Sequence, residues 1–248
     1  MKILLDIGNT HTHVGLADDE MVVSQTTIAT HGSTVPEIEE HLRGFGNQIK
    51  CAAICSVVPD RTSVMQVALQ QAFGFHAEEL THMNLTGVGL DYPEPASIGP
   101  DRLANAIAAY HRLGAPSVVV DFGTAVTFDV VDSRGCYVGG IIAPGVSAMT
   151  DYLHEKTALL PRIEIEEPQS VIGKSTREAM LAGAVHGYRG LISELVRRLQ
   201  TELGSTCLPV IATGGYAGKI AAKIPEIASV DPRLTLEGLR LFLESRSA

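Results

Sequence analysis

Two short turns with the pattern Asp-x-Gly are the residues whose types and spacing most clearly suggest chemistry. They lie at Asp6–Thr10 and at Asp121–Thr124, and each follows an apolar run that predicts a buried strand. An aspartate at a strand end can hold a cation directly or through water, and a glycine lets the backbone approach a phosphate closely. Hydroxyl and backbone N–H groups of such turns can orient phosphates. The two turns therefore predict binding of a nucleoside triphosphate.

The two turns belong to an internal repeat. Residues 3–10 align with residues 118–125, so that the pattern returns 115 positions later (position 121 against position 6). A third strand, expected at 208–212, ends in Thr213-Gly214-Gly215, where the glycines would let a nucleoside lie against the backbone. One Asp-x-Gly alone is usually a hairpin turn, but its duplication together with this third motif favours an actin-like nucleotide-binding fold.

The elements around these motifs predict an α/β fold of two related halves. We expect two actin-like (ribonuclease H-like) domains, 1–115 and 116–248, each a mixed sheet flanked by helices, with a cleft between them. Strands are expected at 2–5, 11–17, 21–29, 51–58, 117–120, 125–131, 137–142 and 208–212, and helices at 35–44, 62–73, 103–113, 176–202 and 236–244. The long helix at 176–202 has an apolar stripe that suits either core packing or a dimer face: Met180, Ala184, Tyr188, Leu191 and Leu195.

Composition restricts the class of protein. The 248 residues carry a net charge of −9 and no tryptophan, which opposes loose binding to nucleic acid or anionic membranes. No apolar run reaches the roughly 20 residues that cross a bilayer, and the first run is too short for a signal peptide, so a cytoplasmic protein is expected. Cys51 and Cys55 have no second Cys or His pair nearby, which favours buried thiols over a zinc site.

Several segments resemble the type III pantothenate kinases. The main matches are residues 6–10, 99–102, 121–127 and 212–215, and smaller ones are 56–59, 140–145, 175–180 and 234–239. They occur in the order of that family and span nearly the whole chain. The resemblance implies phosphorylation of pantothenate by ATP to 4'-phosphopantothenate, the first step of coenzyme A synthesis. It also implies the superfamily of sugar kinases, actin and heat-shock chaperone ATPases, a homodimer, a divalent metal such as Mg²⁺, and K⁺ or NH₄⁺.

The resemblance also assigns roles to residues by position. Asp101 would be the general base that takes the proton of the pantothenate hydroxyl. Asp121 would bind the monovalent cation, and Asp6 would serve the divalent metal, directly or through water. ATP binding falls to Asp6, Ile7, Gly8, Asn9, Thr10, His11, Thr12, His13, Thr124, Thr213, Gly214 and Gly215. Pantothenate binding falls to Tyr92, Gly99, Pro100, Asp101, Arg102 and Thr176.

The residues around Asp101 fit this chemistry but also have simpler interpretations. A carboxylate can accept the hydroxyl proton, and Arg102 could pair with the carboxylate of pantothenate. Without the resemblance, Asp101 would be read as a helix N-cap and Arg102 as an exposed cation. Pro100 replaces a small residue of many family members, and this substitution bears on the flexibility of the loop.

His11 and His13 should lie on one face of a strand because side chains alternate. No third metal ligand is evident, so packing or a phosphate contact is favoured for them.

Two alternatives remain at this stage. One is an actin-like kinase or phosphohydrolase for another small molecule, since the choice of substrate rests on Tyr92, Arg102 and Thr176 alone. The other is an inactive regulatory relative. Such a protein would be expected to lose its acidic residues, whereas Asp6, Asp101 and Asp121 are all present here.

Overall fold

The computed structural model describes residues 1–46 and 48–247 and divides into two compact units. Unit 1 comprises Met1–Gly114, Gly135–Val138 and Arg233–Ala248, and unit 2 comprises Ala115–Arg134 and Gly139–Pro232. The first division lies at residues 114 and 115, next to the expected one. The C-terminal segment, however, belongs to unit 1, whereas the sequence grouped it with the second half. The assignment of 1–115 and 116–248 as functional domains stays a prediction.

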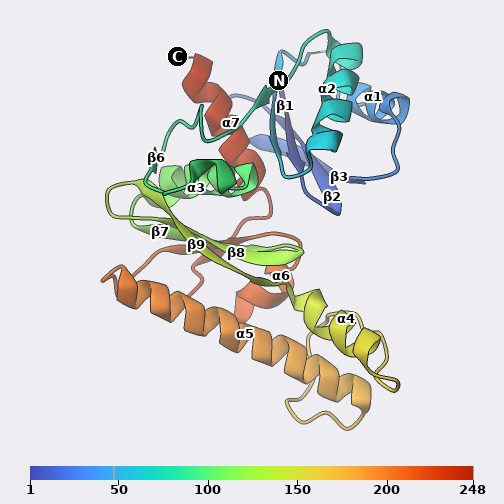
Figure 1. The fold of residues 1–248 in the computed structure, drawn as a ribbon, viewed down its shortest axis with the longest axis vertical. Helices are drawn as coiled ribbons and strands as arrows, with labels where there is room; N and C mark the ends of the chain where they lie inside the picture. Colours follow the sequence, from blue (N-terminus) through green and yellow to red (C-terminus); the bar gives the residue numbers. More distant parts are fainter. Residues whose placement is uncertain (47, 248) are drawn as a thin grey trace. The chain divides into compact units, whose positions relative to one another are not determined.

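Unit 1 contains a five-stranded mixed sheet in the order β3-β2-β1-β4-β5 (Figure 1). The pairs β1–β2 and β2–β3 are antiparallel, whereas β1–β4 and β4–β5 are parallel. The carboxyl ends of β1 and β4 therefore meet at one edge of the sheet. The strands are β1 Lys2–Ile7, β2 His11–Ala17, β3 Val22–Ala29, β4 Cys51–Ser56 and β5 Glu78–Glu79.

Alternation along β1 directs its side chains to two different layers. Ile3, Leu5 and Ile7 pack in one core with residues of helices α1 and α2. Leu4 and Asp6 must then point to the opposite face, on which α7 contacts β1 and β4 and α3 contacts β4. Asp6 therefore lies on the face that α3 covers. The helices are α1 Val35–Arg43, α2 Pro59–Phe73, α3 Pro100–Leu113 and α7 Leu234–Ser247.

Unit 2 repeats this topology with the strand order β9-β8-β7-β10-β11. The pair β7–β8 is antiparallel, and β7–β10 and β10–β11 are parallel, as in β1–β2, β1–β4 and β4–β5. The duplicated Asp-x-Gly turns therefore occupy matching places in two matching sheets. The strands are β7 Ser117–Phe122, β8 Ala125–Val131, β9 Cys136–Pro144, β10 Val210–Thr213 and β11 Ser229–Val230. The start of β9 belongs to unit 1, where β6, Gly89–Leu90, pairs with it.

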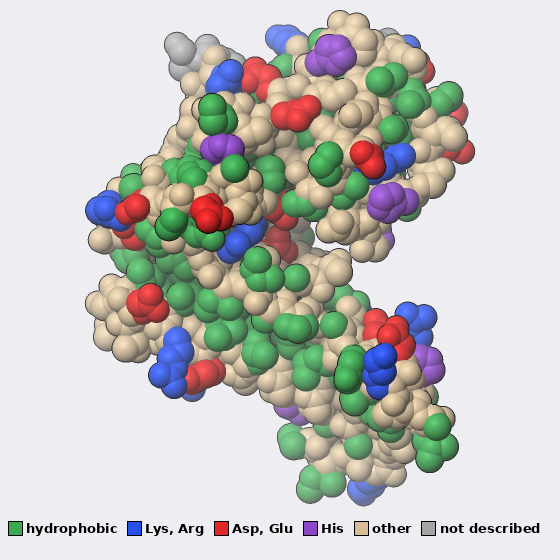
Figure 2. Space-filling view, in the orientation of Figure 1, with side chains coloured by type: hydrophobic (Ala, Val, Ile, Leu, Met, Phe, Trp, Pro, Cys, Tyr) green, Lys and Arg blue, Asp and Glu red, His purple; other side chains and the backbone are tan. Residues whose placement is uncertain are grey.

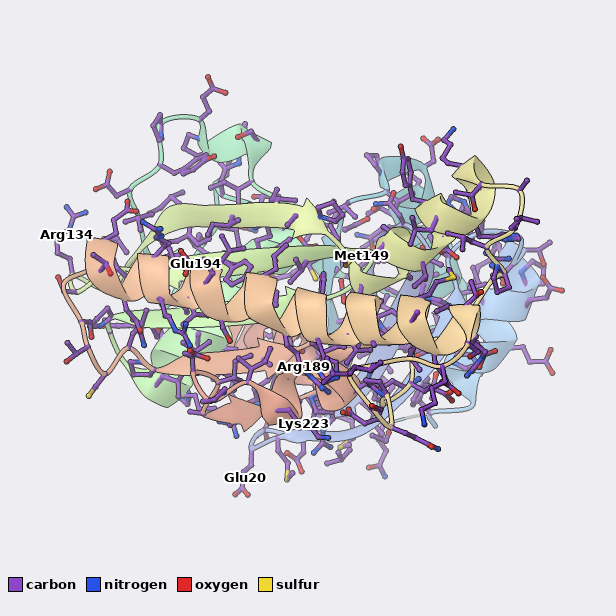
Figure 3. The ribbon with its side chains drawn as sticks, turned by 90° about the horizontal axis from the view of Figure 1, so that it is seen from below. Glu20, Arg134, Met149, Arg189, Glu194 and Lys223 are labelled. Carbon is purple, nitrogen blue, oxygen red and sulfur yellow. The ribbon has the colours of Figure 1, made fainter. Side chains whose placement is uncertain are left out.

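The long helix α5, Thr176–Glu202, covers one face of the unit 2 sheet (Figures 1 and 3). Its buried stripe begins with Met180, Ala184 and Tyr188 but continues through Ile192 and Val196. The apolar stripe expected from the sequence is therefore only partly buried. Its first three residues pack in the core, whereas the fourth, Leu191, is 37% exposed. Two further helices of this unit, which were not expected from the sequence, are α4 Val146–Lys156 and α6 Ala217–Ile220.

A charged cluster fixes the segment that leads into α5. Arg189 donates from Nη1 and Nη2 to Glu167 at 3.1 and 2.7 Å, and Lys223 Nζ donates to the same carboxylate at 2.8 Å. Hydrogen bonds from these two cations lower the pKa of Glu167 to about 2. Figure 3 shows Arg189 and Lys223 near each other beside α5. The cluster ties residue 167 to α5 and to the turn after α6.

None of the helices in the described part of the chain is long and apolar enough to cross a membrane.

The contact between α3 and α7 leads to a stability prediction. A Cβ atom at Gly238 would overlap the backbone of Ala104, so the two helices pack too closely for any side chain there. Gly238→Ala should lower the free energy of unfolding by about 3 kcal/mol, because the helices must separate. Thermal unfolding measures the effect.

Gly190→Ala is the matched control, because Gly190 lies within α5 and has open space around it. This variant should be neutral or more stable by up to about 1 kcal/mol. Equal effects of both substitutions would contradict the packing argument.

Candidate functional site

The first turn is a closed hairpin held by its own backbone. Gly8 N–H donates to the His11 carbonyl at 3.0 Å, and Thr30 Oγ1 donates to the Gly8 carbonyl at 2.7 Å. Thr12 is buried, and its Oγ1 lies 3.0 Å from that of Thr30. The Thr12 hydroxyl therefore stabilises the turn from inside, while Asn9, Thr10 and His11 form its exposed tip.

The second turn has the same design but is one residue shorter. Gly123 N–H donates to the Ala125 carbonyl at 3.1 Å. The carbonyl of Thr124 accepts a hydrogen bond from Gly145 N–H at 3.2 Å, at the point where α4 begins. In the sequence, Gly145 is only the last residue of the family-like segment 140–145. In the structure, its N–H holds the carbonyl of Thr124.

Strand register places a polar row on either side of Asp6. Asp6 is paired with His13 of β2 and with Cys55 of β4, and His13 is paired with Thr27 of β3. Directly paired residues point to the same face of a sheet. Cys55 Sγ lies 3.5 Å from Asp6 Oδ1, and His13 Nδ1 lies 2.9 Å from Thr27 Oγ1. The row therefore reads Thr27, His13, Asp6 and Cys55 across four strands.

The corresponding row in unit 2 has a different chemistry. Asp121 is paired with Thr127 of β8 and with Thr213 of β10. Gly214 follows with φ of 91°, and a Cβ there would overlap the Asp121 carboxylate and the backbone of Phe122. Only glycine can bring the backbone this close. Asp121 thus has hydroxyl neighbours on both sides, whereas Asp6 has an imidazole and a thiol.

The two rows offer different ligand atoms to a cation. Hard cations prefer oxygen ligands, which the hydroxyls of Thr127 and Thr213 add to the Asp121 carboxylate. Asp6 offers one carboxylate between nitrogen and sulfur, so a divalent metal there needs further oxygens from phosphate or water. Among the described residues, no three His, Cys, Asp or Glu side chains are grouped to hold a metal.

His11 and His13 lie on one face of β2, as the alternation predicts, and the buried Thr12 between them lies on the other. His13 is partly buried, and this burial together with the nearby His11 lowers the pKa of His13. His13 contacts Thr27, and His11 is exposed at the tip of the turn. His13 thus packs beside Thr27, and the phosphate contact expected of it stays a prediction.

Asp101 lies in the first turn of α3 but does not cap it. Gly99 is the N-cap and Pro100 the first helical residue, where proline is well tolerated because no N–H is required. The alternative of an Asp101 N-cap is therefore wrong, and Pro100 begins the helix instead of distorting it. Asp101 Oδ1 accepts a hydrogen bond from Arg102 N–H at 2.8 Å. Burial raises the pKa of Asp101, although this hydrogen bond and the Arg102 charge oppose the rise.

Cys55 lies beside Asp6 on the face of the sheet that α3 covers. Burial raises the pKa of Cys55 well above its usual value, and the negative charges of Asp6 and Asp101 raise it further. Cys55 Sγ is 3.5 Å from Asp6 Oδ1, and α3, whose first turn carries Asp101, contacts β4. The structure thus brings to one face of the sheet two elements whose acids are 95 positions apart (101 against 6). The sequence indicated only a buried thiol at position 55.

An aromatic pair lies beside Arg102 in unit 1. The rings of Tyr92 and Tyr137 are 6.2 Å apart, and the Arg102 guanidinium carbon lies 5.9 Å from the Tyr137 ring centre. Asp91 N–H donates to the Tyr137 carbonyl at 3.0 Å. Tyr137 thus connects two predicted substrate residues, and no local sequence signal singled it out. Thr176, the first residue of α5, is exposed and belongs to unit 2.

Comparisons with known proteins show the family of the chain. The family model described as type III pantothenate kinase matches residues 2–198. A type III pantothenate kinase of Akkermansia muciniphila is 45% identical over 96% of this chain and 96% of its own length. One of Methylacidiphilum infernorum is 41% identical over 98% of this chain and 88% of its own.

Solved structures of lower identity share the fold. A Campylobacter jejuni protein described as a "conserved putative Baf family transcriptional activator" has a TM-score of 0.64 at 20% identity, covering 99% of this chain and 98% of its own. A "putative N-acetylmannosamine kinase" of Listeria monocytogenes has a TM-score of 0.56 at 11% identity, covering 100% and 99%. The predicted α/β class with two related actin-like halves is confirmed by these likenesses and by the repeated sheets.

Proposed function

Because the chain belongs to the type III pantothenate kinase family, it phosphorylates pantothenate with ATP in coenzyme A biosynthesis, and we propose that Asp101 is the general base. The reaction uses ATP with a divalent metal, which when bound neutralises charge on the phosphates. Phosphoryl transfer needs little covalent help from the protein beyond positioning and removal of the hydroxyl proton. The observation that carries the proposal is the half-buried Asp101 carboxylate in the first turn of α3, the helix that contacts the strand of Cys55.

The two oxygens of Asp101 have different tasks in this proposal. Oδ1 accepts the Arg102 N–H, which fixes the carboxylate in one orientation. Oδ2 then takes the proton from the pantothenate hydroxyl. A general base works best when its pKa approaches the working pH, and burial moves the pKa of Asp101 in that direction.

Pantothenate is held by residues around this base. We assign its carboxylate to Arg102, whose guanidinium lies over Tyr137. Tyr92, the second ring of the aromatic pair, also contacts the substrate in this proposal. The backbone of Gly99 and Pro100, just before Asp101, contacts it as well. Thr176, at the N-terminus of α5, completes the substrate contacts.

ATP binding involves the Asp-x-Gly turn of each unit in this proposal. Residues 6–11 and His13 contact the phosphates, Asp6 serves the divalent metal directly or through water, and Thr12 acts by holding the turn. Thr124 contacts ATP from the second turn, and residues 213–215 meet the adenosine. Asp121 holds a monovalent cation, K⁺ or NH₄⁺, because Thr127 and Thr213 supply hydroxyl oxygens beside it.

We infer that the enzyme is a homodimer and that the apolar surface of unit 2 forms its interface. Hydrophobic side chains are exposed over α4 and the segment after it (Figure 2). Met149, Tyr152 and Leu153 share one side of α4, at helical spacing. Leu159, Val171, Ile172 and Leu191 are also exposed in this unit. Exposed apolar side chains in such number are typical of protein–protein contacts.

A cytoplasmic location fits the enzyme. Its four cysteines, all in the described part of the chain, form no disulfide. A reducing compartment keeps thiols in this state.

Asp101→Asn should lower kcat by about 100- to 10,000-fold, because the amide cannot accept the hydroxyl proton. ADP release is measured with pantothenate, with a sugar and with water as acceptor. The wild type should release ADP with pantothenate, and ATP binding by the variant should stay near that of the wild type. Unchanged turnover would remove Asp101 from the mechanism.

Thermal unfolding of Asp101→Asn tests whether misfolding, instead of loss of the base, causes the loss of activity. Since the folded-state pKa of Asp101 is raised, the protonated carboxyl favours the folded state, and this contribution is lost as pH rises through the raised pKa. At pH values above the raised pKa, Asp101→Asn should therefore have a higher Tm than the wild type. At pH values below the ordinary pKa of an aspartate, the two proteins should have the same Tm. A lower Tm at pH 8 would contradict the burial argument.

The rate should depend on K⁺ or NH₄⁺, with Na⁺ a poor substitute. Thr213→Val keeps the shape of the side chain but removes one oxygen beside Asp121, so the apparent Kd for K⁺ should rise about tenfold. Titration of activity with KCl at constant ionic strength measures this. Full activity of the wild type in sodium buffer would exclude the role given to Asp121.

Tyr152→Asp should convert the dimer into monomers, because it places a charge at a residue that is 62% exposed on the apolar side of α4. Light scattering gives the mass. Met83→Asp is the control, since Met83 is 83% exposed in unit 1 and should leave the dimer intact. A dimeric Tyr152→Asp would place the interface elsewhere.

A further inference from the structure

Cys55 occupies an unusual place for a structural thiol. Its side chain is 0% exposed, and the parallel pairing of β1 and β4 places it directly opposite Asp6. Its Sγ atom lies 3.5 Å from Asp6 Oδ1, within the range of a hydrogen bond that involves sulfur. A thiol has a weak S–H donor, and an ionised carboxylate only accepts. The direction of this hydrogen bond is therefore from Cys55 to Asp6.

The carboxylate of Asp6 benefits from such a contact. Asp6 is the next-to-last residue of β1, and pairing with β2 and β4 fixes its backbone but not by itself the rotation of its carboxylate. The torsion that rotates a carboxylate is broad and has no sharp minimum. A donor at one oxygen selects one orientation. Because Cys55 lies in a buried strand, packing holds its sulfur in place.

The second half of the molecule has a matching arrangement. Thr213 of β10 is paired with Asp121 as Cys55 of β4 is paired with Asp6. Thr213 is also buried. Each repeat therefore places a small side chain with one S–H or O–H group across the parallel pair from its aspartate. An unrelated core cysteine would not be expected at this one equivalent position.

We propose that Cys55 is a positioning residue: its thiol donates to Asp6 Oδ1 and so helps to orient this carboxylate for the divalent metal of ATP. The proposal rests on the role proposed above for Asp6. Cys55 itself touches neither substrate nor metal, and it acts through the carboxylate.

The test compares variants with and without a donor at position 55. Cys55→Ala and Cys55→Val remove the donor, Cys55→Ser restores one, and Cys51→Ala changes a cysteine of the same strand that is paired with Lys2 instead. Mn²⁺ binding with a non-hydrolysable ATP analogue is followed by electron paramagnetic resonance. The Mg²⁺ dependence of kcat and the KM for pantothenate are measured in parallel.

The donor-free variants should weaken Mn²⁺ binding and raise the half-saturating Mg²⁺ about tenfold, with little change in the KM for pantothenate. Cys55→Ser should stay within about threefold of the wild type, and Cys51→Ala should match it. If Cys55→Ala does not fold, Cys55→Val keeps the core filled and gives the same comparison. A donor-free variant that folds and binds Mn²⁺ like the wild type would overturn the proposal.

Asp6→Asn separates this proposal from the one on which it rests. If Asp6→Asn leaves metal binding unchanged, the role of Asp6 is wrong and the proposal for Cys55 is overturned with it. If Asp6→Asn weakens binding and Cys55→Ala does not, only the proposal for Cys55 is overturned. The proposal is supported when Cys55→Ala has its effect alone and adds nothing in the Asp6→Asn background, since two groups that act through one contact are not additive.

Discussion

The parallel pairing of each Asp-x-Gly strand with the strand beside it is the constraint on which the rest of the site depends. It aligns the carboxyl ends of β1 and β4 in unit 1 and of β7 and β10 in unit 2. Parallel strands need a long crossover, so residues far apart in sequence meet at that edge. Asp6 thereby gains Cys55 as a neighbour, and Asp121 gains Thr213. One topology, used twice, produces two carboxylates with different surroundings.

The difference between the two rows gives a physical basis for dividing the cation roles. Hydroxyl oxygens on both sides of Asp121 suit a cation bound with little help from elsewhere. The imidazole and thiol beside Asp6 do not, so the divalent metal proposed for Asp6 would need oxygens from the phosphates. The two repeats therefore share a topology and a turn but differ in the partners of their aspartates.

The position of Asp101, the proposed base, depends on the C-terminal helix. Its helix, α3, packs on α7 so closely that Gly238 has no room for a side chain. Arg240 of α7 in turn donates to both carboxylate oxygens of Glu237 at 2.9 Å and to the Asp19 carbonyl at 2.8 Å, which ties the helix to the β2–β3 turn. The C-terminal helix therefore supports the acceptor side of the site.

The sequence alone determined the α/β class, the repeat and most strands and helices, because hydrophobic periodicity and linear motifs are local properties of the chain. The motifs and the family resemblance also singled out Asp6, Asp101 and Asp121 as candidate site residues. The sequence left Cys55 as an ordinary thiol, did not single out Tyr137 or α4, and did not indicate that the C-terminal helix packs with unit 1. Only the tertiary structure decided these points. Strand register and helix packing join residues that are distant in sequence, and no local pattern records which of them will meet.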